Sequence, residues 1–208
     1  MPLSLSPIVE SAVTRIKDLL NSLPTSLTSS QSLSPVRHDR PPFLEAMRHY
    51  IQISARHKIL VIHRALLAHG GSPHERRRAH AACVENAQSI IQELEQGQHS
   101  GSGNMQSFWT IPYHGLAAAV VLALDWIGIR RDHATQRETV NARRQEVQRA
   151  RRTLEKLAPT SRIARRGLKV SHCDSARTVL QVLLMLLIGA VRRGARGRDI
   201  QSWSETWE

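Results

Sequence analysis

Apolar positions recur at helical spacing along most of the chain. In the segment 50–67 they follow offsets of four, three and four, which places them on one side of a helix: Ala55, Ile59, Ile62 and Leu66. We expect this helix to begin at Pro42 or Phe43, because proline suits a first turn, and to end at His69, before a Gly-Gly pair.

Similar spacing predicts further helices over residues 7–20, 73–97, 108–129, 132–157 and 163–191. The second long helix has a capping-box pattern at its start, formed by Ser72 and Glu75 around Pro73. Within the third, residues 116–124 are apolar on every side, so this helix should lie at the centre of a bundle. The helix over 132–157 has only a narrow apolar stripe and an otherwise charged surface.

The fold class predicted from these patterns is all-α, an irregular bundle of about five to six helices. Aromatic residues make up only 4% of the chain and no run of alternating β-branched residues occurs. The predicted organisation is a short helix with a disordered Ser/Pro-rich linker over 1–42, a helical domain over 43–191, and a basic then polar, disordered tail over 192–208.

Positive charge is concentrated in the second half of the chain. The formal net charge is +12, and between Arg130 and Lys169 there are thirteen lysines and arginines against four acids. Such a surface attracts polyanions, although a solvated helix face is the simplest interpretation. The candidate contacts for a polyanion or an import receptor are Arg143, Arg144, Arg151 and Arg152. Because no aromatic or Asn/Gln reading face accompanies them, any nucleic-acid binding should be sequence-independent.

No catalytic or metal-binding pattern is found in the sequence, so we expect no enzyme, no cofactor and no metal in this chain. Cys83 and Cys173 are too few for a zinc site, and Cys83 lies on a buried stripe that favours core packing. The histidines of the first long helix point in different directions: His49, His57, His63 and His69. Neither a nucleophile elbow nor a phosphate-binding loop is present. Cysteine usage favours a reduced intracellular compartment.

The apolar runs 115–124 and 179–191 are shorter than the roughly twenty residues that cross a bilayer, so no transmembrane segment is predicted. An alternative reading makes the chain a peripheral membrane-associated helical protein. In that case the run 179–191 would lie in the interface, flanked by a basic tail of Arg192, Arg193, Arg196 and Arg198.

Four segments occur in an order that resembles a known family. They are the run from His57 to Leu67, Cys83 with Ala87 to Ile91, Phe108 to His114, and Ile163 to Val170. Over residues 43–170 the chain is similar to the C-terminal half of the fungal-specific transcription factor domain, the middle homology region of fungal binuclear zinc-cluster regulators. The resemblance makes His63, Arg64 and Cys83 structural signature residues.

The chain departs from the family in two ways. Ala65 stands where the family usually has proline after His63 and Arg64, and the six-cysteine zinc cluster is absent together with much of the domain's N-terminal half. The resemblance therefore implies a truncated regulatory and interaction domain in the nucleus without its own DNA-binding module, since zinc belongs only to full-length members. Its implied partners are the transcription machinery or a full-length regulator, with a small-molecule effector as a further candidate. The alternative from charge alone is a basic helical protein that binds nucleic acid non-specifically.

Overall fold

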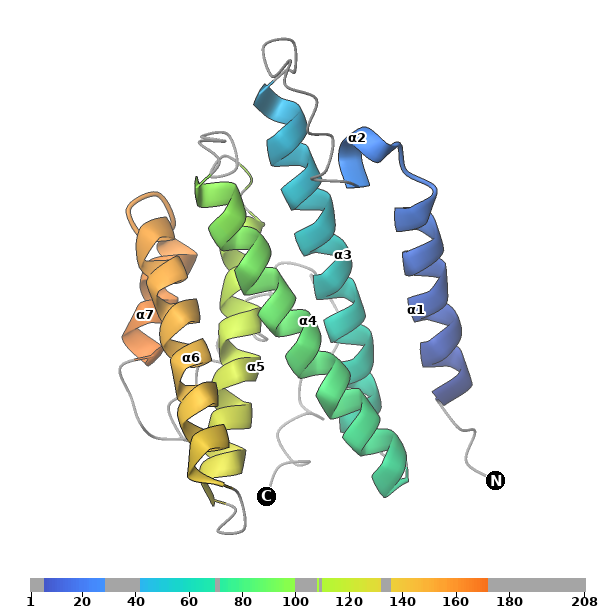
Figure 1. Ribbon diagram of the computed structural model, residues 1–208, viewed down its shortest axis with the longest axis vertical. Helices are drawn as coiled ribbons and strands as arrows, with labels where there is room; N and C mark the ends of the chain where they lie inside the picture. The colour runs from blue at the N-terminus through green and yellow to red at the C-terminus, as the bar shows by residue number, and fades with distance from the viewer. Residues whose placement is uncertain are drawn as a thin grey trace, which may run out of the picture.

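Every regular element that the computed structural model describes is a helix (Figure 1). The described residues are 6–28, 42–69, 72–99, 108, 110–131 and 136–171. The helices are α1 (Ser6–Asn21), α2 (Thr25–Thr28), α3 (Pro42–His69), α4 (Pro73–His99), α5 (Ile111–Arg131), α6 (Arg137–Leu157) and α7 (Arg162–Ser171). The all-α prediction is confirmed.

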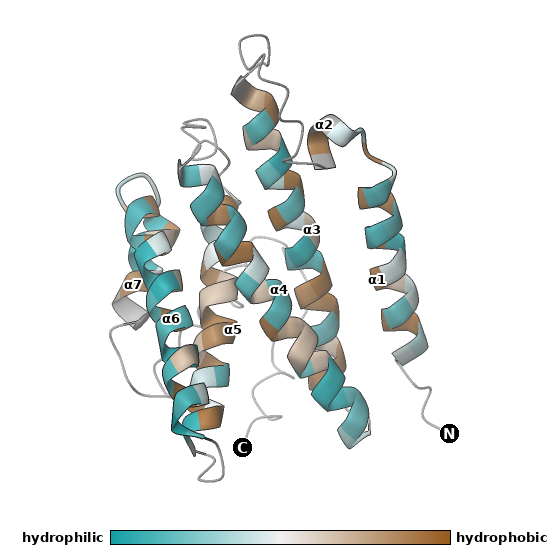
Figure 2. Ribbon diagram, viewed as in Figure 1, coloured by the Kyte–Doolittle hydropathy of each residue, from teal (hydrophilic) through white to brown (hydrophobic). Residues whose placement is uncertain are grey.

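The two longest helices, α3 and α4, form an antiparallel pair that runs through the middle of the molecule (Figure 1). Helix α1 lies beside α3 at one edge, and α6 and α7 lie at the other. Helix α5 packs against α3, α4, α6 and α7, so its predicted central position is confirmed. Figure 2 shows the contrast between the largely hydrophilic α6 and the more apolar α5 behind it.

One hydrophobic core is shared by helices α3, α4, α5, α6 and α7. Its fully buried members include Ile53, Leu60, Ile90, Leu94, Ile111, Leu122, Leu154 and Leu157. Two glycines let helices approach closely, because a Cβ atom at Gly115 would lie 2.8 Å from Leu94 Cδ1, and one at Gly167 would lie 2.6 Å from Leu116 Cδ1. Packing of this density is what holds helices of modest intrinsic stability in place.

The predicted capping box at the start of α4 is present. The Ser72 N–H donates to Glu75 Oε2 at 2.7 Å, and the Glu75 N–H donates to Ser72 Oγ at 3.2 Å. Other boundaries moved by a few residues. Helix α5 begins at Ile111 and not at Phe108, because the Ile111 N–H closes a turn onto the Phe108 carbonyl at 3.0 Å. Helix α4 runs to His99, past the predicted end at Gly97, which is buried.

The predicted N-terminal helix is present as α1, and part of the predicted linker is helical. A second, smaller core joins α1 to α3 and α4 through Val9, Val13, Ile59, Leu66 and Ala79. The four-residue helix α2 interrupts the predicted linker and packs against α3. It follows Pro24, whose carbonyl accepts the Leu27 N–H at 2.8 Å, so proline here opens a helical turn. The rest of the predicted linker, 29–41, lies outside the described residues, as do the end of the predicted helical domain, 172–191, and the predicted tail, 192–208.

By length and composition alone, one described helix is apolar enough to cross a bilayer, over Ile111–Arg130 of α5. The apolar run 115–124 noted in the sequence is shorter than this window. Ile111, Trp126 and Ile127 lie outside that run and add to the apolar length of the helix. Of the window, 56% is buried among the other helices. A core helix of a bundle passes the same test, and the contacts of α5 with four other helices are those of a core helix.

Candidate functional site

The signature residues expected from the resemblance lie on the facing surfaces of α3 and α4. Cys83 is 2% exposed, and its thiol donates to the Leu60 carbonyl with an Sγ to O distance of 3.7 Å. Burial raises the pKa of the Cys83 thiol to about 11, with the Arg64 charge opposing this shift. Arg64 is half-buried, and His63 lines a cleft described below. The predicted core role of Cys83 is confirmed.

Because of this environment, Cys83 should not react with a thiol reagent in the folded protein at neutral pH. We expect a variant in which Cys173 is replaced by serine to show no fast-reacting thiol toward Ellman's reagent, and one thiol after unfolding in guanidinium. Absorbance at 412 nm measures both amounts. A thiol that reacts within seconds in the native state would mean that Cys83 is accessible and activated.

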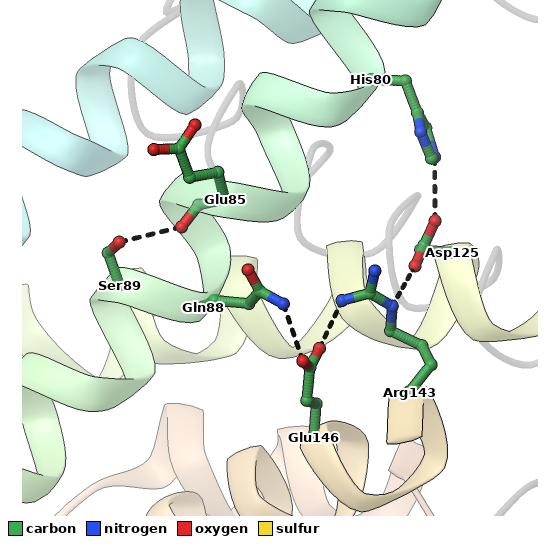
Figure 3. A network of polar contacts seen from close by, with 7 residues as sticks. All are labelled: His80, Glu85, Gln88, Ser89, Asp125, Arg143 and Glu146. Carbon is green, nitrogen blue, oxygen red and sulfur yellow. Dashed lines mark hydrogen bonds and ion pairs between the residues drawn. The ribbon is translucent and has the colours of Figure 1, made fainter. Parts of the chain in front are cut away.

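A network of charged and polar side chains joins α4, α5 and α6 (Figure 3). At its centre, Asp125 of α5 has a side chain that is only 4% exposed and lies 2.5 Å from Arg143 Nε of α6. His80 Nε2 of α4 lies 3.2 Å from the other carboxylate oxygen, and the hydrogen bond that the His80 ring donates to Asp125 raises the His80 pKa against the effect of burial. Arg143 also pairs with Glu146, which accepts a hydrogen bond from Gln88 Nε2 at 2.7 Å. The network fixes α6 against the α4–α5 pair.

The four candidate polyanion contacts on α6 do not form one surface. Arg143 is turned inward, with a side chain 19% exposed and two carboxylate partners, so its guanidinium is engaged within the protein. Arg151 pairs with Glu155 one turn along α6 at 2.9 Å. Arg144 and Arg152 are exposed. A polyanion contact on this helix would therefore use Arg144 and Arg152, and Arg143 has a structural role.

The described histidines of α3 face three different neighbours. His49 is buried between Arg48 and Glu93, with Nδ1 2.8 Å from Glu93 Oε2. His57 meets α5, and His63 faces α1 and α4. Among the described residues no group of three or more His, Cys, Asp or Glu side chains is placed to hold a metal ion. The side chain of His69 lies outside the described residues.

Buried His57 and half-buried His114 form a pair between α3 and α5. Their ring centroids are 4.2 Å apart, and the Tyr113 ring stands edge-on to His57 at 5.4 Å. Neither His57 Nε2 nor His114 Nδ1 has a hydrogen-bond partner within the described part of the chain, although both atoms are buried. Burial lowers the pKa of each imidazole to about 4, with nearby cations, Lys58 among them, adding to the shift. Both rings are therefore neutral at pH 7.

A cleft with a volume of about 390 Å³ lies where α1 crosses α3 and α4. Its floor is apolar, formed by Val9, Val13, Leu66 and Ala79. Its polar lining comes from Ser6, Glu10, Thr14, Lys17, His63, Glu75 and Arg78. His63 Nδ1 is a buried atom without a hydrogen-bond partner in the described ranges. The cleft therefore combines an apolar floor with polar side chains from all three helices.

Comparisons with known proteins returned nothing: no family model matches the chain, and neither a curated protein nor a solved structure matches it.

Sequence reasoning missed the two places where distant residues meet. Lys17 and Arg78 reach the same cleft from α1 and α4, and the signal for this was the apolar stripe of α1, which needed another helix to cover it. Asp125 directly follows the apolar run 116–124, and no partner was predicted for it. A lone carboxylate in such a run needs a buried partner, and that requirement pointed to one of the arginines of α6.

Proposed function

We propose that this chain is a non-enzymatic regulatory and interaction domain of the fungal zinc-cluster transcription factor type, a truncated form that acts in the nucleus through protein partners. It carries no DNA-binding module of its own over the segment that resembles the family. Its role is to present a folded helical surface to the transcription machinery or to a full-length regulator.

The observation that supports this proposal most is that the four segments carrying the resemblance share one hydrophobic core. Leu60 comes from the first segment, Ile90 and Ile91 from the second, Ile111 from the third, and Ala164 from the fourth. The Cys83 thiol also bonds to the Leu60 carbonyl, which links the first two segments directly. Segments that pack together in this way behave as one domain, as a shared family origin requires.

A reporter assay tests the regulatory role. The chain is fused to a heterologous DNA-binding module in yeast, and reporter output is compared with that of the module alone. We expect a several-fold change, up or down, that is lost when Leu154, which is 1% exposed, is replaced by aspartate, because a charge at this position disrupts the core. Output equal to that of the module alone, from a fusion shown to be folded and nuclear, would contradict the proposal.

A second candidate function is sequence-independent nucleic-acid binding, which the exposed arginines of α6 and α7 favour. Arg144, Arg152, Arg165 and Arg166 are all exposed. Binding of this kind weakens steeply with salt and is reduced when Arg144 and Arg152 are both replaced by glutamine. A gel-mobility assay with duplex DNA separates the two functions, because the regulatory role leaves mobility unchanged at physiological salt.

A further inference from the structure

We propose that the cleft between α1, α3 and α4 is a binding site for a small amphipathic anion, a carboxylate with a short hydrocarbon body. The inference does not depend on a role in transcription, since it concerns only what the cleft can hold. Ligand sites of small molecules are usually concave, mostly apolar and fitted with a few polar groups that orient the ligand. The cleft has these features.

The size and floor of the cleft suit a hydrocarbon body. Its volume of about 390 Å³ lies in the range of small-molecule sites. Val9 and Val13 of α1 face Leu66 of α3 and Ala79 of α4, all nearly buried, and Ala82 extends this apolar surface. These side chains are short, so the three helices leave space between them that a hydrocarbon chain would fill with the loss of water from both surfaces.

The charges around the cleft favour an anion over a cation. Each of the two acids that line it already has a partner: Glu10 pairs with Arg78 at 3.4 Å, and Glu75 accepts the Ser72 N–H at the positive N-terminus of α4. Lys17 also lines the cleft and pairs with no carboxylate in the described part of the chain. Lys17 is therefore the uncompensated charge that a carboxylate head would meet.

His63 supplies the polar group that orients the head. His63 lines the cleft, and its buried Nδ1 lacks a partner among the described residues. A small rotation of the ring that brings this nitrogen to a bound carboxylate would remove the free-energy cost of leaving it unpaired. Burial lowers the His63 pKa, and Lys17 and Arg78 lower it further, so both cations act on this ring. The neutral imidazole can donate one N–H to a carboxylate oxygen while Lys17 balances the charge.

Binding in this cleft would bridge α1 to the α3–α4 pair. Within the described part of the chain, α1 is held by the small core around Val9 and Val13 and by the exposed pair of Glu10 with Arg78. A ligand that touches both sides adds to these contacts and slows the opening of α1. This consequence distinguishes binding in the cleft from adsorption elsewhere on the surface.

Octanoate, octylamine and octanol are suitable probes, because they share one hydrocarbon chain and differ in head group. Titration calorimetry with the full chain at pH 7.5 should show octanoate binding about fivefold to tenfold more tightly than octylamine, a difference expected from one partly exposed charge contact. Hydrogen exchange should show slower exchange of the α1 amides with octanoate. Equal binding of octanoate and octylamine, or no binding of octanoate, would overturn the proposal.

Matched lysine variants locate the site. Replacing exposed Lys17 with glutamine should weaken octanoate binding about fivefold and leave octanol binding unchanged. Lys58→Gln is the control, since Lys58 is an exposed lysine of α3 that does not line the cleft. Because both changes are at exposed positions, both variants keep the fold. Equal loss in the two variants, or no loss in Lys17→Gln, would count against the cleft.

Discussion

Replacing Arg143 with methionine is expected to lower the free energy of unfolding by about 3–5 kcal/mol, the usual cost of removing one partner of a buried ion pair. The reason is the position of Asp125, whose side chain is 4% exposed and lies 2.5 Å from Arg143 Nε. Without the guanidinium, the Asp125 carboxylate keeps His80 as its one ion-pair partner among the described residues, and that histidine is more than half exposed. Urea denaturation followed by circular dichroism measures the change.

The neighbouring arginine provides the control for this prediction. Arg144→Met removes the same charge from the same helix at an exposed position and should change the stability by less than about 0.5 kcal/mol. Replacing Asp125 with leucine in the Arg143→Met background should recover most of the loss, because the buried charge is then gone as well. If Arg143→Met and Arg144→Met are equally stable, Asp125 is not buried against Arg143 in solution.

The helices themselves could be predicted from the sequence because their signals are local. The capping box at Ser72 and Glu75 and the apolar repeat of α3 each depend on residues within a few turns of one another. Boundaries were less accurate. The short helix α2 was missed because its segment was predicted to be part of a Ser/Pro-rich linker, whereas Pro24 stands at the start of a helical turn.

The sites could not be predicted because they depend on pairings between distant helices. Arg143 and Arg144 are adjacent and chemically identical, yet only Arg143 reaches Asp125 on the neighbouring helix. Lys17 and His63 line the same cleft only because α1 packs against α3. The predicted linker between these two helices did not determine how they pack. Helical periodicity states which face of a helix is buried, but it does not state which helix covers it.

The second large effect expected is a loss of stability in mild acid, caused by the His57–His114 pair. The pKa of each ring is lowered from 6.5 to about 4 in the folded protein. Between these values the unfolded chain binds protons that the folded chain does not, so stability is full above pH 6.5 and falls as the pH drops toward 4. His57, which is 8% exposed, should contribute up to about 1.4 kcal/mol per pH unit, and half-buried His114 a smaller amount.

Urea midpoints measured from pH 7 to pH 4 would test this, with His57→Phe as the variant that keeps a ring and removes the titration. The free energy of unfolding of this variant should fall less steeply with decreasing pH than that of the unaltered chain. The variant therefore gains stability relative to the unaltered chain as the pH drops. His80→Gln is the control. The Asp125 contact raises the His80 pKa, so the stability that His80 contributes is fully present below pH 6.5 and is lost only as the pH rises above that value. The effect of His80→Gln should therefore stay constant over the acid range in which the His57–His114 pair titrates. Parallel plots of urea midpoint against pH for His57→Phe and the unaltered chain would contradict this prediction. They would show that protons reach the pair without opening the α3–α5 contact.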